Sequence, residues 1–224
     1  MIRIACVLLV SVGLCTSIRA GEISENFDGT LSRTAWTFLG KPKTADGMLV
    51  LATDDAQPQA YLDCGLVGQT GEASLNFIEH PLEIVIEDVQ FSGSAPAENR
   101  ILQVIIASDS AKETQAASYV KLRLSADGRA SVTVGGAGAS EKTVISTGFS
   151  LPIQKLSLQL DGKNAHLAIK TPQGDVKVEG ELEGHLDASL WSGAEPYLIV
   201  KAARRPSEGD CKVTLDSFSI SPLK

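Results

Sequence analysis

Residues 156–178 read LSLQLDGKNAHLAIKTPQGDVKV, and this stretch decides the fold class. Apolar and polar residues alternate in three short runs, so each run places its apolar side chains on one face of an extended strand. The runs are separated by Asp161-Gly162-Lys163-Asn164 and Thr171-Pro172-Gln173-Gly174, whose residue types favour tight turns. Three such strands joined by two turns predict an antiparallel meander with one buried face.

The same two-residue period recurs along most of the chain. It predicts further strands at Met48–Ala52, Ala60–Cys64, Leu82–Phe91, Ile101–Ala107, Val120–Leu124, Val132–Val134, Tyr197–Ala202 and Cys211–Ile220. Turn-forming Gly, Pro, Asp and Asn separate these runs, and little helix is expected. A dozen or so short strands indicate a single all-β domain over residues 21–224, built as a two-sheet antiparallel sandwich or a barrel.

The first twenty residues differ in composition from the rest. Arg3 precedes an apolar run from Ile4 to Leu14, and Ala20 is a small residue at a plausible cleavage position. This layout predicts a signal peptide over residues 1–20 and a secreted or periplasmic domain, because exported proteins carry such a segment. The alternative is an uncleaved N-terminal anchor, although the run is shorter than the ~20 residues that span a membrane. No later stretch is apolar enough to span one.

Charge and cysteine content restrict the expected partners. Cleavage after Ala20 would remove two arginines and no acid, so the formal net charge would change from −7 to −9. Such a surface repels nucleic acid and anionic membranes, and neither is expected as a partner. Two of the four cysteines would leave with the signal peptide. Cys64 and Cys211 remain, and an even pair in an oxidising compartment predicts a disulfide.

Motifs near both ends resemble those of a known superfamily. The segment Glu25-Asn26-Phe27-Asp28-Gly29 is followed by Trp36 and by ADGMLVL at Ala45–Leu51, and the chain closes with VTLDSFSI at Val213–Ile220. This arrangement resembles the concanavalin A-like lectin/glucanase superfamily and, more loosely, jelly-roll carbohydrate-binding modules. The resemblance implies a jelly roll of two antiparallel sheets that is often extracellular and often binds sugar. The fold alone does not fix the function.

One segment, Glu83-Ile84-Val85-Ile86-Glu87, hints at an enzyme. Strand alternation places Glu83, Val85 and Glu87 on one face. The segment is similar to a strand of laminarinase-like glycosidases in the superfamily, which carry Glu, Asp and Glu at this spacing, the outer two as nucleophile and acid/base. Here Val85 replaces the central Asp. We therefore expect two solvated glutamates on a polar strand face and assign no catalytic residue.

Two features suggest a ligand-binding site. Trp191 lies in a loop rich in Ser, Gly and Pro, and is the aromatic candidate for stacking on a sugar ring. Tyr119, Lys121 and Arg123 alternate with apolar residues, so they share an outward strand face that could hydrogen-bond sugar hydroxyls. The alternative is that Trp191 fills the end of the sandwich and the Tyr119 face is merely solvated.

The resemblance also implies a structural calcium site that uses Asp28 and Asp216, one acid from each end of the domain. Calcium takes about 6–8 oxygen ligands, so these two would supply a minority of them. A pair of hydrogen-bonded turn acids is the alternative. No other cofactor is expected. The apolar positions change parity across Asp216, which predicts a β-bulge there.

Three functions fit this sequence. The first is a secreted, non-catalytic module that binds a glycan or a cell-surface polymer. The second is a glycoside hydrolase-like enzyme of the same superfamily, and the third is a structural or adhesive domain of an envelope assembly. A groove with two or more carboxylates would favour the enzyme, an exposed aromatic beside a polar face the binding module, and a large apolar patch the structural domain.

Overall fold

The computed structural model describes residues 23–29, 37–40, 42–54, 59–65, 75–109, 115–204 and 209–223. The predicted signal peptide and Trp36 lie outside these ranges. Within them, no helix is long and apolar enough to cross a membrane.

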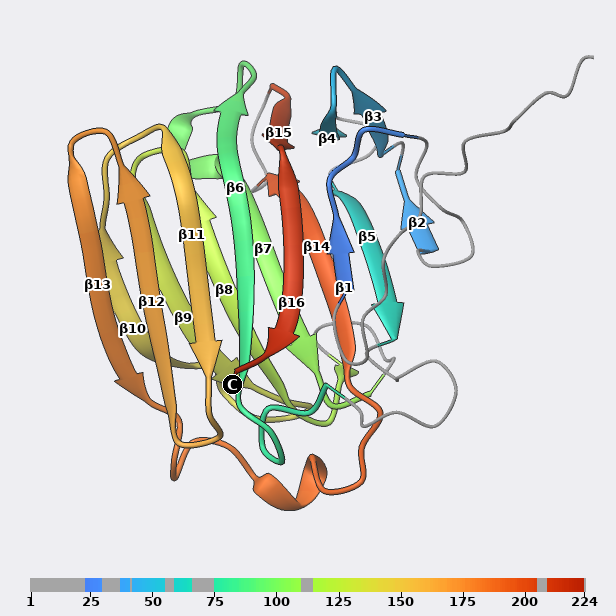
Figure 1. The fold of residues 1–224 in the computed structure, drawn as a ribbon, viewed down its shortest axis with the longest axis vertical. Helices are drawn as coiled ribbons and strands as arrows, with labels where there is room; N and C mark the ends of the chain where they lie inside the picture. The colour runs from blue at the N-terminus through green and yellow to red at the C-terminus, as the bar shows by residue number, and fades with distance from the viewer. Residues whose placement is uncertain are drawn as a thin grey trace, which may run out of the picture.

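Two antiparallel sheets pack face to face, which confirms the predicted all-β jelly-roll sandwich (Figure 1). The nine-stranded sheet contains β13 (Gly174–Glu181), β12 (Asn164–Thr171), β11 (Ile153–Leu160), β6 (Leu82–Ser92), β15 (Cys211–Leu215), β4 (Met48–Thr53) and β3 (Lys43–Ala45), with β16 (Ser217–Pro222) and β1 (Ile23–Glu25) continuing from β6. The seven-stranded sheet contains β10 (Lys142–Gly148), β9 (Arg129–Gly135), β8 (Tyr119–Ser125), β7 (Arg100–Ala107), β14 (Tyr197–Arg204), β5 (Gln59–Gly65) and β2 (Thr37–Leu39). The short 3-10 turns η1 (Ala97–Asn99) and η3 (Ala188–Leu190) lie in loops.

The predicted meander is β11, β12 and β13. Leu158 lies opposite Leu167, which lies opposite Val178, so the apolar positions of the three strands align on the inner face. In the first turn, the Asp161 carboxylate accepts hydrogen bonds from two backbone N–H groups within the same turn. The alternation of apolar and polar residues fixes how these strands pair, because a slip of one residue would turn every apolar side chain to solvent.

Around Asp216, the buried residues shift from odd to even positions, as predicted. The predicted β-bulge, which would insert one extra residue, is absent at this position. The apolar residues on both sides of Asp216 are all buried in the same core, namely Val213, Leu215, Phe218 and Ile220. Thr214 lies opposite Gln90 and Ser217 opposite Glu87, so the register with β6 continues without an inserted residue. The β15–β16 segment and its neighbour β6 therefore both change their inward-facing positions at the same level.

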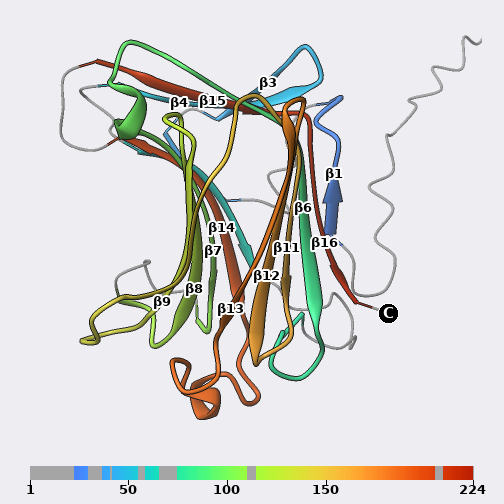
Figure 2. The ribbon, with the colours of Figure 1, turned by 90° about the vertical axis from the view of Figure 1, so that its left-hand side faces the viewer.

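The break in β6 is at Asp88, whose φ of 50° is in the left-handed region. Ile86 before it and Val89 after it are both buried, and β11 makes the same change between Ile153 and Leu156. A bend shared by three neighbouring strands turns the sheet through a corner. Figure 2 shows the result: β15, β4 and β3 cross one end of the sandwich, roughly perpendicular to β6 and β11.

Candidate ligand-binding site

The prediction that Trp191 stacks on a ligand is wrong, because its side chain is 0% exposed. Its ring meets the ring of Phe77 edge to face with centroids 4.6 Å apart, and its Nε1 donates to Ser118 Oγ at 3.0 Å. The buried Asn76 amide donates to the Trp191 carbonyl. Trp191 therefore fills the end of the sandwich, which was the alternative. The composition of a loop indicates its exposure but not which side chain the loop inserts into the core.

The predicted outward face of β8 exists, but two of its three residues are occupied. Tyr119 and Lys121 are only 3% and 7% exposed. The Tyr119 hydroxyl donates to Glu141 Oε1 at 2.7 Å, and the Lys121 ammonium pairs with the same carboxylate. Arg123 is half-buried. Of the three residues, Arg123 has the most exposed side chain, and it lines a pocket.

Glu141 lies in the loop between β9 and β10 and is held as an anion. Partial burial raises the pKa of Glu141, but hydrogen bonds from Lys121 and Tyr119, together with the charges of Lys121 and Arg123, outweigh burial and lower that pKa. The carboxylate therefore stays ionised at neutral pH and fixes the loop to β8.

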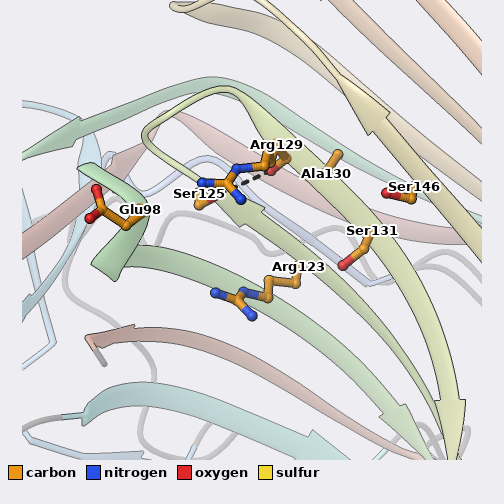
Figure 3. Close-up of a pocket in the computed structure, with 7 residues that line it drawn as sticks. All are labelled: Glu98, Arg123, Ser125, Arg129, Ala130, Ser131 and Ser146. Carbon is orange, nitrogen blue, oxygen red and sulfur yellow. Dashed lines mark hydrogen bonds between the residues drawn. The ribbon is translucent and has the colours of Figure 1, made fainter. Parts of the chain in front are cut away.

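Arg123 borders a pocket of about 160 Å³ on the outer face of the seven-stranded sheet (Figure 3). The lining comes from η1, β8, β9, β10 and their turns: Glu98, Arg123, Ser125, Arg129, Ala130, Ser131 and Ser146. Figure 3 shows the guanidinium groups of Arg123 and Arg129 on the side of Glu98, with Ser131 and Ser146 on the other side. The pocket thus combines cationic donors, hydroxyl groups and one carboxylate.

Asp127, in the turn between β8 and β9, fixes two of the lining residues. Ser125 Oγ donates to Asp127 Oδ1 at 2.5 Å, and Arg129 Nε donates to Asp127 Oδ2 at 2.6 Å. Burial raises the pKa of Asp127, but these hydrogen bonds and the Arg129 charge lower it further than burial raises it. An ionised Asp127 therefore holds the Arg129 guanidinium at the pocket.

A single row of outward side chains joins this pocket to the opposite edge of the sheet. The strand registers place one residue of each strand opposite the next, in the order Leu39, Tyr61, Lys201, Gln103, Arg123, Ser131 and Ser146. We call these seven residues the outer row. Adjacent strands are about 4.8 Å apart, so the outer row from Tyr61 to Ser146 spans about 24 Å.

The outer row contains an aromatic that the sequence analysis missed. Tyr61 is half-buried and Leu39 is 46% exposed, so both present apolar surface at one end of the row. Tyr61 alternates with the buried Ala60 and Leu62, and this signal could have placed it on an outward face. Its alignment with Arg123 depends on the pairing of strands that are far apart in sequence.

Two side-chain oxygens on this face are buried and have no hydrogen-bond partner within the described part of the chain. Gln103 Oε1 belongs to the outer row, and Thr133 Oγ1 lies on β9 opposite Lys121. Buried polar atoms are paired in the great majority of cases. These oxygens therefore mark unused hydrogen-bonding capacity on the outer face of the seven-stranded sheet.

Known structures share this architecture. The chain is similar to the CBM2 module of the evolved Dit of Lactobacillus casei BL23 phage J-1, with TM-score 0.56, 9% identity, and coverage of 90% of this chain and 95% of that chain. It is also similar to metal-free lectin I-B4 from Griffonia simplicifolia, with TM-score 0.59, 11% identity, and coverage of 91% and 99%. Both structures share the two-sheet jelly-roll fold of this chain.

A third similar structure comes from work on endo-acting O-glycanases with which human gut bacteria initiate mucin breakdown. It has TM-score 0.55 and 13% identity, and the match covers 90% of this chain and 99% of that chain. No protein-family model and no curated protein sequence matches the chain. At these identities, the structural comparisons show the fold alone.

The two glutamates of the candidate catalytic segment lie on the other side of the molecule, on the outer face of the nine-stranded sheet. Glu83 Oε1 accepts hydrogen bonds from Ser157 Oγ at 2.5 Å and from Gln159 Nε2 at 3.2 Å. Glu87 pairs with Lys155 at 3.3 Å. A shallow depression of about 410 Å³ on this face is lined by one carboxylate, Glu179.

Asp28 and Asp216 lie near the same end of the β1–β16 pair, because Glu25 of β1 lies opposite Phe218 of β16. Both aspartate side chains are exposed, and Asp28 accepts a hydrogen bond from Asn26 Nδ2 at 2.9 Å. In the described ranges, no group of three or more His, Cys, Asp or Glu is arranged to hold a metal ion. The calcium site stays a prediction.

The predicted disulfide is not formed, and Cys64 and Cys211 are both free and buried. Cys64 lies opposite Leu198, which lies opposite Ile106 of β7, whereas the Cys211 thiol lies beside the backbone of Ile101. Five residues along β7 separate these two levels by about 17 Å, far more than the ~7 Å between Cα atoms that a disulfide allows. The cysteines are on strands that the jelly roll brings together, but at different heights.

We expect both thiols to be unreactive in the native protein. Burial raises the pKa of the Cys64 thiol to about 12 and also raises that of Cys211, and only the thiolate is a good nucleophile. Iodoacetamide at pH 8 should leave the folded domain unmodified, but should alkylate Cys64 and Cys211 after denaturation without reductant. After denaturation, a Cys64→Ser variant should gain one carbamidomethyl group instead of two. A denatured protein that reacts only after reduction would contain the disulfide and contradict this structure.

Proposed function

We propose that this chain is an exported, non-catalytic module that binds a glycan on the outer face of its seven-stranded sheet. The observation that carries the proposal is the outer row, which runs from apolar surface at Leu39 and Tyr61 to the pocket at Arg123. The fold supports it, because the similar structures include a CBM2 module and a lectin.

The chemistry of the outer row suits a polyhydroxylated ligand. A tyrosine ring gives the face of a sugar an apolar surface, and neighbouring polar groups bond its hydroxyls. Gln103 and Arg123 follow Tyr61 along the outer row, beyond the buried Lys201, so a linear oligosaccharide lying across the strands would reach all three. A shallow face excludes little water, and we expect micromolar to millimolar dissociation constants.

The described surface gives less support to a structural or adhesive role. Among the described residues, the exposed large hydrophobic side chains are Leu39 and Leu190, at 46% and 41% exposure. Two such side chains are too few to make the large apolar patch expected of an assembly interface.

Binding of the domain (residues 21–224) to an oligosaccharide array tests this function. We expect at least one glycan class to bind, and Tyr61→Ala to weaken that binding because the variant removes the aromatic surface. The melting temperature of Tyr61→Ala serves as a control for folding. An array that covers plant, bacterial and animal glycans with no binding at millimolar concentration would contradict the proposal.

We predict no glycosidase activity at Glu83 and Glu87. Each carboxylate is engaged by side chains of a neighbouring strand, and Val85 lies between them where the similar glycosidases have Asp. Glu83→Gln and Glu87→Gln should fold normally and bind glycan as the wild type does. Hydrolysis of a β-glucan or an aryl glycoside by the wild type, abolished by either substitution, would instead identify an enzyme.

A further inference from the structure

Positive and negative side chains balance on the outer face of the seven-stranded sheet. Its outward strand positions carry four cations: Lys121, Arg123, Arg129 and Lys201. Four carboxylates lie on or beside the same face: Asp63 on β5, Glu98 in η1, Asp127 in the turn between β8 and β9, and Glu141 in the loop between β9 and β10. Among these described residues, the face therefore has no excess of positive charge.

Two of the cations form ion pairs with carboxylates of the neighbouring turn and loop. Lys121 pairs with Glu141, and Arg129 pairs with Asp127. Both carboxylates have lowered pKa values for the reasons given above, so both pairs persist at neutral pH.

The other two cations are also engaged within the protein. Lys201 is only 9% exposed, and Lys201 and Arg123 each interact with other groups of the protein. The Arg123 charge is one of the causes that lower the pKa of Glu141, so the guanidinium lies close to that carboxylate. An anionic ligand would therefore compete with carboxylates that the protein itself supplies.

The polar groups that remain unengaged in the outer row are uncharged. The side chains of Tyr61, Gln103, Ser131 and Ser146 make no hydrogen bond within the described part of the chain. Hydroxyl and amide groups both donate and accept hydrogen bonds, whereas an ionised carboxylate only accepts them. A sugar hydroxyl also donates and accepts, so the unengaged groups of the outer row match a ligand rich in hydroxyls.

We infer that the glycan is neutral and that the outer row discriminates against sugars that carry carboxylate or sulfate groups. This inference rests on the proposed function and names the class of sugar. A neutral sugar binds the unengaged hydroxyl and amide groups and leaves the internal ion pairs in place. An acidic sugar brings a negative charge beside Asp63, Glu98 and Glu141, and like charges placed together at an interface weaken binding.

The net charge of the chain acts in the same direction as these local carboxylates. The formal net charge is −7, so the chain as a whole repels anionic polymers. Substitution separates the two contributions. Removal of one carboxylate from this face changes both the local and the net charge, whereas removal of one from the opposite sheet changes the net charge alone.

The test compares one polymer in neutral and acidic forms. We would titrate the domain (residues 21–224) with glucan, xylan, galactan and mannan, and then with carboxymethylated and sulfated forms of the neutral polymer that binds most tightly. Polygalacturonate with its methyl ester, and hyaluronan with its carboxyl-reduced form, test the reverse case, in which the acidic polymer is the better ligand.

We expect each acidic form to bind about tenfold or more weakly than its neutral counterpart. Binding of the neutral form should stay within about twofold from low to high salt, because no ion pair with the ligand is screened. Tighter or equal binding of the acidic form would overturn the inference and leave the proposed function intact. Failure of every polymer to bind would contradict the proposed function as well.

Glu141→Gln tests whether the discrimination lies on this face. The variant keeps the size of the side chain and removes the charge that pairs with Lys121, so affinity for the acidic form should rise about threefold or more. Glu98→Gln, at the exposed edge of the pocket, should act in the same direction and leaves the β9–β10 loop unchanged.

The matched control is Glu179→Gln on β13 of the opposite sheet, whose side chain is 59% exposed. It makes the same change in net charge, and affinity for the acidic form should stay at the wild-type value. Equal affinities of folded Glu141→Gln, Glu98→Gln and Glu179→Gln for the acidic form would assign the discrimination to net charge and overturn the role of the outer row.

Discussion

Replacement of Trp191 by alanine is expected to lower the free energy of unfolding by about 3–5 kcal/mol, because truncation of a fully buried aromatic leaves a cavity. The Trp191 ring is 0% exposed and contacts Phe77. The variant also leaves the buried Ser118 hydroxyl without the indole donor. For a domain of this size, the melting temperature should fall by about 10 °C.

Urea denaturation followed by circular dichroism measures this effect without relying on tryptophan fluorescence. Trp191→Phe should cost less, since it keeps most of the apolar volume and loses the Nε1 hydrogen bond. Leu190→Ala is a matched control one residue away: Leu190 is 41% exposed, and its truncation should change stability by less than about 0.5 kcal/mol. If Trp191→Ala were as stable as Leu190→Ala, the closed end of the sandwich described above would be incorrect.

Substitution of Gly180 by valine is expected to destabilise the domain by at least about 1–3 kcal/mol, the usual cost of overpacking a core. Gly180 is buried on β13, where this edge of the nine-stranded sheet meets β10 of the other sheet. A Cβ atom there would lie 2.4 Å from the Val144 carbonyl oxygen and 2.7 Å from Ile145 Cγ1. Backbone atoms cannot rotate away, so the two edges must separate.

The control for this prediction is Gly148→Ala on β10, where the nearest atom to a new Cβ is the Gly128 carbonyl oxygen at 3.7 Å. That variant should be close to the wild type in thermal unfolding, whereas Gly180→Ala should be measurably less stable and Gly180→Val less stable again. Wild-type stability of Gly180→Val would show that the two edge strands do not meet as described.

The sequence predicts the strands of this fold better than the corner that closes one end of it. The meander of residues 156–178 follows from strict alternation, which places one apolar set on one face. The bend in β6 occurs at Asp88, a non-glycine residue with positive φ, and no turn-forming pair precedes or follows it. In the sequence, the matching bend at Asp216 shows only as a shift of the apolar residues from odd to even positions.

The candidate site was predicted in part, for a similar reason. Alternation placed Arg123 outward, and the structure confirms that position. Alternation could not show that Glu141, in the loop between β9 and β10, binds the side chains of Tyr119 and Lys121. The alignment of Tyr61 with Arg123 requires the pairing of β5, β14, β7 and β8, which is set by long-range topology and is not encoded in any local pattern.

The most direct test of this account compares one cation on each outer face. Arg123→Ala removes a cation of the outer row, and Lys170→Ala removes an exposed cation on β12 of the opposite sheet. Isothermal titration of both variants with the tightest-binding oligosaccharide from the array should show affinity about tenfold or more weaker for Arg123→Ala and unchanged for Lys170→Ala. Unchanged binding by a folded Arg123→Ala, or loss of binding in Lys170→Ala, would place the ligand elsewhere and contradict the account.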